Sequence, residues 1–113
     1  MIVMKLRELP FEQIKSKQKI WEVRLNDDKR KSIHIGDSIL FRKLPDLFEG
    51  IVCRVVDIKH FQSFREMASV LSLTSLGFEM GATADTCEEV YHAYYTPEEE
   101  KEFGVVAFKL DLV

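Results

Sequence analysis

The stretch "KQKIWEVRL", residues 17–25, decides the fold and also holds the candidate site. Its apolar and polar residues alternate, which places Trp21 and Val23 on one face and Glu22 and Arg24 on the other. Alternation with this period predicts a β-strand. We therefore expect Trp21 and Val23 in the core, and the two charged side chains directed into a cleft.

Three charged residues of this stretch are candidates for one polar site. Glu22 and Arg24 lie about 6.6 Å apart along the same strand face, so both can contact one ligand. Lys19 precedes the strand, where a chain leaving a helix need not alternate strictly, so its amine can reach the same place. Acid and base pairs on exposed strand faces are common and contribute little stability. The spacing alone therefore leaves a binding site and a plain surface ion pair both open.

The neighbouring segments predict an α+β domain. Strands are predicted from β-branched and alternating apolar residues at 1–6, 38–41, 50–61 and 105–113. Helices are predicted from apolar spacing and capping residues at 10–17, 63–71, 84–95 and 96–104. Because strands and helices do not alternate as in parallel α/β folds, we expect a strongly bent, antiparallel-rich sheet or barrel.

Two of these segments carry more detailed predictions. In the last strand, Val106, Phe108, Leu110 and Leu112 are expected to point inward. In the helix at 84–95, one side carries Cys87, Val90, Tyr91 and Tyr94. The interval 74–83, "TSLGFEMGAT", contains two glycines that permit sharp turns, and it is interpreted either as a mobile lid or as a plain surface connection.

Composition and charge narrow the function classes. A chain of 113 residues with 46% apolar and 31% charged residues fits one globular domain, residues 1–113. No apolar run approaches the length of a membrane span, and no secretion signal is visible, so we expect a cytoplasmic protein without a membrane partner. The net charge is −3, yet residues 1–43 carry 11 basic against 6 acidic residues. One half of the chain could therefore face a polyanion.

Metal-binding and redox sites are not indicated. Cys53 and Cys87 are too far apart in the sequence for a zinc knuckle or a redox pair, and we expect free thiols. His34, His60 and His92 show no ligand spacing. We expect neither a metal nor a cofactor.

The chain resembles the ASCH family, a branch of the PUA-like superfamily. The family signature Gly-x-Lys-x-x-Glu-x-Arg is matched at Lys19, Glu22 and Arg24, and only Lys17 departs from it, at the glycine position. The resemblance continues through the corner at residues 35–37, "IGD", and into the C-terminal segment. It implies a small PUA-like β-barrel of about five or six strands with short flanking helices.

The resemblance also implies a function. It suggests RNA, a nucleotide or a nucleoside as ligand, bound in a cleft beside the motif. Lys19 and Arg24 would hold a phosphate or a base carbonyl, and Glu22 would accept a hydrogen bond from an exocyclic amine.

Some similar proteins are amidohydrolases that deacylate N4-acetylcytidine with a lysine, a threonine and a downstream glutamate. Here Lys19 matches the lysine, Glu22 occupies the threonine position, and Glu79 is matched to the glutamate. A carboxylate between two cations is a poor base, so hydrolysis is the alternative to binding without chemistry. A protein-interaction module is a third reading, and the sequence does not predict the oligomeric state.

Overall fold

The computed structural model describes all residues, 1–113, as five strands, five α-helices and one short 3₁₀-helix. The strands are β1 (Ile2–Leu6), β2 (Trp21–Leu25), β3 (Ser38–Lys43), β4 (Gly50–Phe61) and β5 (Val105–Leu112). The helices are α1 (Glu8–Lys15), α2 (Asp28–Lys31), α3 (Phe64–Val70), η1 (Thr74–Leu76), α4 (Ala84–His92) and α5 (Pro97–Phe103). All the strands and helices predicted from the sequence are present, with α2 and η1 as short additions.

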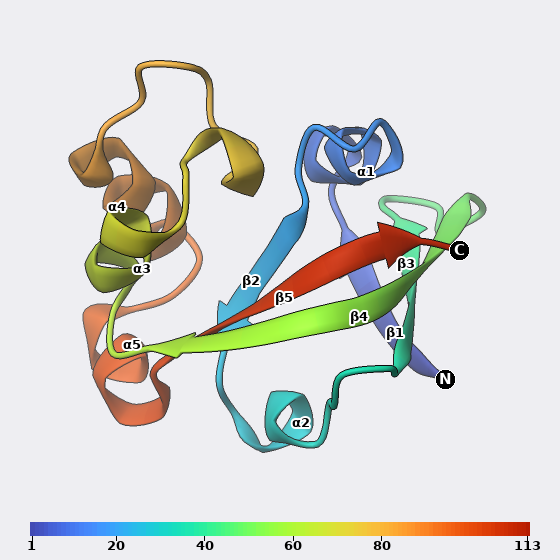
Figure 1. Ribbon diagram of the computed structural model, residues 1–113, viewed down its shortest axis with the longest axis horizontal. Coiled ribbons are helices and arrows are strands. Elements are labelled where there is room, and N and C mark those ends of the chain that lie inside the picture. Colours follow the sequence, from blue (N-terminus) through green and yellow to red (C-terminus); the bar gives the residue numbers. More distant parts are fainter.

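The five strands form one curled sheet in the order β1-β3-β4-β5-β2 (Figure 1). β1 and β3 are parallel, and the other three pairs are antiparallel. The long strand β4 pairs with β3 near its start and with β5 along most of its length, with a bulge between Val55 and Asp57. The predicted α+β class is confirmed, and the sheet forms a half-barrel whose two edge strands are β1 and β2.

Two hydrophobic cores lie on opposite faces of the sheet. The first packs Phe11 and Ile14 of α1 against β1, β3, β4 and β5. The second packs the side chains of Trp21 and Val23 against α3 and α4. The predicted inward face of β2 is therefore confirmed, and its core is the one beneath the helices.

The prediction for β5 is correct in part. Val106, Phe108 and Leu110 enter the first core as expected. Leu112 does not, and it is 36% exposed although its partner across the sheet, Cys53, is fully buried. The alternate residues Val105 and Ala107 are also buried, since the second core covers the opposite face of the same strand.

Capping residues fix both ends of the chain segment that carries α4 and α5. Thr83 caps α4, and Thr96 forms a capping box with Glu99 at the start of α5, where Pro97 occupies the first turn. Gly104 closes α5 with a φ of 73° and leads into β5. The C-terminal end of α4 is thereby held near β2.

None of the helices combines the length and the apolar composition that crossing a bilayer requires.

Candidate functional site

The turn that precedes β2 keeps a glycine-type backbone without a glycine. Lys17 has a φ of 68°, in the left-handed region that glycine adopts at little cost. The backbone N–H of Lys19 then donates to the carbonyl oxygen of Gln13 at 3.0 Å. Lys17 thus adopts a backbone conformation that glycine, the residue of the family signature, favours, and the side chain of Lys19 reaches Glu22 of β2.

Lys19, Glu22 and Arg24 meet in one place, and we call them the buried cluster. Lys19 Nζ lies 3.0 Å from Glu22 Oε1, and Arg24 Nε and Nη2 lie 2.9 and 2.8 Å from Glu22 Oε2. The side chain of Glu22 is only 4% exposed. Glu22 is thus as deeply buried as the core residues of its strand, a depth that the sequence did not predict.

The charges of the buried cluster determine its protonation. Burial alone would raise the pKa of the Glu22 carboxyl, but the charges of Lys19 and Arg24 outweigh burial and leave the pKa below its ordinary value. Burial acts to lower the pKa of Arg24, and the Glu22 carboxylate more than offsets it. Glu22 is therefore ionised at neutral pH, with both oxygens already engaged by cations of the chain.

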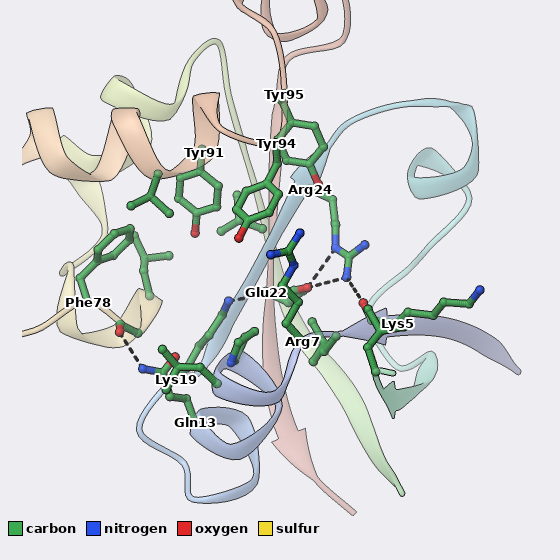
Figure 2. Close-up of a pocket in the computed structure, with 18 of the residues that line it drawn as sticks. Lys5, Arg7, Gln13, Lys19, Glu22, Arg24, Phe78, Tyr91, Tyr94 and Tyr95 are labelled. Carbon is green, nitrogen blue, oxygen red and sulfur yellow. Dashed lines mark hydrogen bonds and ion pairs between the residues drawn. The ribbon is translucent and has the colours of Figure 1, made fainter. Parts of the chain in front are cut away.

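Arg24 also connects the two edges of the half-barrel. Its Nη2 donates to the backbone carbonyl oxygen of Lys5 in β1 at 3.1 Å. β1 and β2 are not neighbours in the sheet, so this hydrogen bond spans its opening (Figure 2). Arg24 is consequently occupied both by Glu22 and by β1.

The buried cluster forms the floor of a pocket of about 480 Å³, a volume that suits a small-molecule ligand. The pocket lies between α1, β1 and the C-terminal end of α4. One side is formed by four aromatic side chains, which we call the aromatic wall: Phe78, Tyr91, Tyr94 and Tyr95. Figure 2 shows these rings beside and above the charged floor. Leu9, Pro10 and Leu44 contribute apolar surface at the opposite side.

Tyr91 presents an unpartnered hydroxyl to this pocket. Its side chain is buried and its ring stacks on Phe64 at a centroid distance of 4.7 Å. The hydroxyl points into the pocket and makes no hydrogen bond within the chain (Figure 2). Burial, followed by the nearby charge of Glu22, raises the pKa of Tyr91 well above its usual value, so the hydroxyl stays protonated. The hydroxyl is accessible from the pocket and has no partner within the chain, so it can donate a hydrogen bond to a ligand.

The interval 74–83 borders the pocket and is anchored at its start. Gln13 Nε2 donates to the carbonyl oxygen of Gly77 at 2.9 Å, and the N–H of Ile20 donates to the carbonyl oxygen of Ser75 at 2.9 Å. Gly77 has a φ of 97°, and a Cβ there would lie 2.6 Å from Gln13 Oε1. Glu79 follows, exposed, at the pocket rim. The first part of the interval is thus a fixed part of the pocket, and the lid interpretation stays a prediction for the part after Phe78.

The remaining reactive side chains lie outside the pocket. Cys53 and Cys87 are buried free thiols, and burial, with a smaller contribution from a nearby carboxylate, raises the pKa of each to about 11. Neither thiol lines the pocket, so neither is a nucleophile for it. His92 bonds Glu100 at 2.8 Å, and no group of three His, Cys, Asp or Glu side chains is arranged to hold a metal.

Sequence reasoning found the floor of the pocket and missed most of its wall. It placed Tyr91 and Tyr94 on one side of a helix, but gave no role to Tyr95, Phe78 or Arg7, which also line the pocket. A signal was present, because the segment "YHAYY" places three tyrosines at one helix end. Nothing local indicated that this helix end lies over the buried cluster.

Comparison with solved structures identifies close relatives of the fold. The hypothetical protein PH0355 is 31% identical, with a TM-score of 0.86 over 98% of this chain and 97% of that chain. Protein PF0455 from Pyrococcus furiosus is 30% identical, with a TM-score of 0.75 over 99% of this chain and 96% of that chain. ASCH from Zymomonas mobilis is 16% identical, with a TM-score of 0.69 over 96% of this chain and 65% of that chain, and it shows the same fold.

Comparison of the sequence gives the family. No curated protein matches the chain. The family model described as "ASCH domain" matches residues 4–113, which is nearly the whole length. The half-barrel with flanking helices agrees with the fold that the resemblance implied. The chain therefore belongs to the ASCH domain family.

Proposed function

We propose that the pocket binds one nucleoside unit, either of a single-stranded RNA or of a free nucleotide. The observation that carries this proposal is the combination of a buried charged floor and an aromatic wall around a single pocket of suitable volume. Aromatic side chains stack on bases, which all have flat faces, and a few placed polar groups then select among the base edges.

The floor favours ligand atoms that accept hydrogen bonds. Both oxygens of Glu22 are engaged by cations, whereas Lys19 Nζ carries three donors and has one partner, and Tyr91 has none. A base carbonyl is the matching group. Glu22 and Arg24 hold Lys19 in place in this arrangement. The exocyclic amine that the sequence assigned to Glu22 is the less favoured partner.

The overall charge supports a pocket for one unit over a long nucleic-acid track. Proteins that follow a phosphate backbone need many cations, whereas this chain has a net charge of −3. A pocket that takes a single base needs only a few placed groups, as found here.

The proposal is tested by titrating the protein with the four ribonucleosides and with short single-stranded RNA, followed by NMR chemical shifts. We expect shifts centred on Lys19 and the aromatic wall, and affinity reduced about five- to tenfold in Tyr91→Phe, the equivalent of one lost hydrogen bond. Phe48→Ala is the control, because Phe48 is an exposed aromatic residue outside the pocket. Absence of binding by every nucleoside and RNA would refute the proposal.

Hydrolysis of an acylated nucleoside is the second candidate, and one observation favours it. Lys19 and Glu79 line the same pocket as Glu22. The two cations beside Glu22 lower the pKa of its carboxyl, which makes it a weak base. We therefore expect no cytidine from N4-acetylcytidine above the background rate. Release at about 1 per second or faster, abolished in Lys19→Ala, would instead establish the amidohydrolase.

A further inference from the structure

Arg7 stands at the mouth of the pocket without a carboxylate partner. It precedes α1 and lines the pocket, and its side chain makes no ion pair. Arg24 and Arg65, in contrast, are each paired with acidic residues. An exposed guanidinium held beside a cavity without an anion is free to bind the anion of a ligand.

Tyr94 holds Arg7 in this position. The Arg7 Cζ lies 4.9 Å from the centroid of the Tyr94 ring, within the range of a cation–π interaction. Figure 2 shows the Arg7 guanidinium beside this ring, above the side of the pocket where Glu22 lies. Such a contact restricts the guanidinium while leaving its N–H groups unpaired. It reduces the entropy that the side chain would lose on binding an anion.

The other cations of the pocket are less suited to this role. Arg24 donates to Glu22 and to the backbone of β1, and Lys19 donates to Glu22 at the floor. The side chain of Lys5 extends away from the pocket in Figure 2, and only its carbonyl faces Arg24. Arg7 is therefore the cation at the mouth with its donors available.

We propose that Arg7 binds the phosphate group attached to the nucleoside whose base lies against the aromatic wall. The inference rests on the proposed nucleoside-binding function and adds the place and the residue for the phosphate. Guanidinium and phosphate form two parallel hydrogen bonds, a geometry that a lysine ammonium cannot reproduce. The base enters the dry part of the pocket, and the phosphate stays at the hydrated mouth.

The test compares nucleosides with their 5′-monophosphates by calorimetric titration, in the parent protein and in Arg7→Ala, Arg7→Lys and Arg54→Ala. Arg54 is the matched control, because it is also exposed and makes no ion pair, but lies on β4 outside the pocket. We expect the phosphate to raise affinity about tenfold in the parent and in Arg54→Ala. Within each variant the gain is the ratio of monophosphate affinity to nucleoside affinity, so any change in base stacking cancels. Arg7→Ala should lose this gain, and Arg7→Lys should retain only part of it.

Short single-stranded RNA distinguishes the two sources of the phosphate. If Arg7 increases affinity for the monophosphate but not for the RNA, the phosphate belongs to a free nucleotide. If Arg7 increases affinity for the RNA as well, the phosphate is a phosphodiester of the RNA. Both results support the inference. Nucleoside binding with a phosphate gain that is absent, or is equal in Arg7→Ala, overturns the role of Arg7 and leaves the proposed function standing. Failure of nucleosides, nucleotides and RNA alike to bind overturns both.

Discussion

One arrangement of charges occurs twice in this molecule, once buried and once at the surface. In the buried cluster, Glu22 lies between two cations and its side chain is 4% exposed. In a second group, which we call the surface cluster, Glu49 lies 2.8 Å from Lys15 and 3.3 Å from Lys43, and its side chain is 43% exposed. In both clusters a carboxylate lies between two cations, and the surface cluster differs in its contact with water and in a second carboxylate, Glu12, 2.8 Å from Lys43.

The backbone before each cluster is also alike. Lys17 and Leu47 are the two residues other than glycine with a positive φ, at 68° and 66°, and each stands two positions before a cluster residue, Lys19 or Glu49. Local geometry therefore does not distinguish the clusters. The difference is that α4 and residues 74–78 cover one of them, so tertiary packing turns one of two similar ion-pair groups into the floor of a pocket.

Burial makes the first cluster expensive to keep for stability alone. Removing charges from water costs free energy that their attraction only partly returns, and apolar replacements of buried ion pairs are often neutral or stabilising. At the surface, ion pairs form with little desolvation and are screened by salt. The desolvation cost of the buried cluster therefore supports the proposal that it serves ligand binding.

The largest expected contrast comes from removing the central charge of each cluster. Glu22→Gln leaves two buried cations without a counter-charge, and we expect the free energy of unfolding to fall by about 3–5 kcal/mol. The matched variant Glu49→Gln should shift the urea midpoint much less, because exposed ion pairs contribute little. Urea titrations of both variants measure the contrast. Equal shifts of the urea midpoint in the two variants would contradict the expected difference between the clusters.

Removing the outer cation gives a smaller effect. Arg24→Ala leaves Glu22 with Lys19 as its only counter-charge and removes the hydrogen bond to β1, so we expect a loss of about 2–3 kcal/mol of stability. Ligand affinity should fall as well, because Lys19 is no longer fixed. In the surface cluster, Lys43→Ala should have no measurable effect on unfolding. A fully stable Arg24→Ala would show that the link across the sheet opening contributes nothing.

Acid should separate the clusters by their response to salt. The pKa of Glu22 in the folded state lies below the ordinary value of 4.5, so its charge stabilises the fold above about pH 4.5 and stops doing so as the pH falls through the lowered value. The pKa of Glu49 is lowered too, chiefly by its hydrogen bonds to Lys15 and then Lys43.

Urea midpoints measured from neutral pH to about pH 3 test this difference. The contribution of Glu22 is the loss of stability on acidification in the parent protein minus the loss in Glu22→Gln. This contribution should persist in about 1 M salt, where charges are screened beyond about 3 Å. The contribution of Glu49, obtained in the same way from Glu49→Gln, should vanish in the same salt. Equal salt sensitivity of the two parts would contradict the difference in burial.

The smallest effect concerns the turns before the clusters. A residue with a side chain in the left-handed region lowers the free energy of unfolding by about 1–2 kcal/mol. Glycine avoids this strain, but its greater freedom in the unfolded chain lowers the free energy of unfolding by about 0.5–1 kcal/mol. Lys17→Gly should therefore stabilise the fold by about 0.5–1 kcal/mol. Leu47→Gly should gain less, because it also removes a half-buried apolar side chain. Thermal unfolding measures both, and destabilisation by Lys17→Gly would show that its side chain makes a needed contact.

Much of the fold was predictable because it follows from local patterns. The alternation around Trp21 gave the correct core face of β2, and the signature spacing predicted that Lys19 and Arg24 meet at Glu22. The capping residues at Thr96 and Gly104 also predicted the helix at 96–104, which is present as α5.

The rest depended on contacts between distant segments. The depth of Glu22 and the role of Tyr91 result from α4 packing over β2, and no local pattern encodes that packing. Arg7 is adjacent to Tyr94 for the same reason. Leu112 alternates like an inward residue, but it is the last residue of β5 and is 36% exposed. Sequence periodicity assigns faces, and only tertiary structure decides what covers them.

The hydrogen bond from Arg24 to the carbonyl of Lys5 has a consequence for self-association. An open sheet has two edges whose free backbone groups can pair with strands of another molecule, which is a common route to aggregation. Here both edges, β1 and β2, border the same pocket, and the Arg24 side chain holds them toward each other. Arg24 therefore occupies one free backbone acceptor of the β1 edge, and we expect its loss to cost colloidal stability as well as the proposed binding.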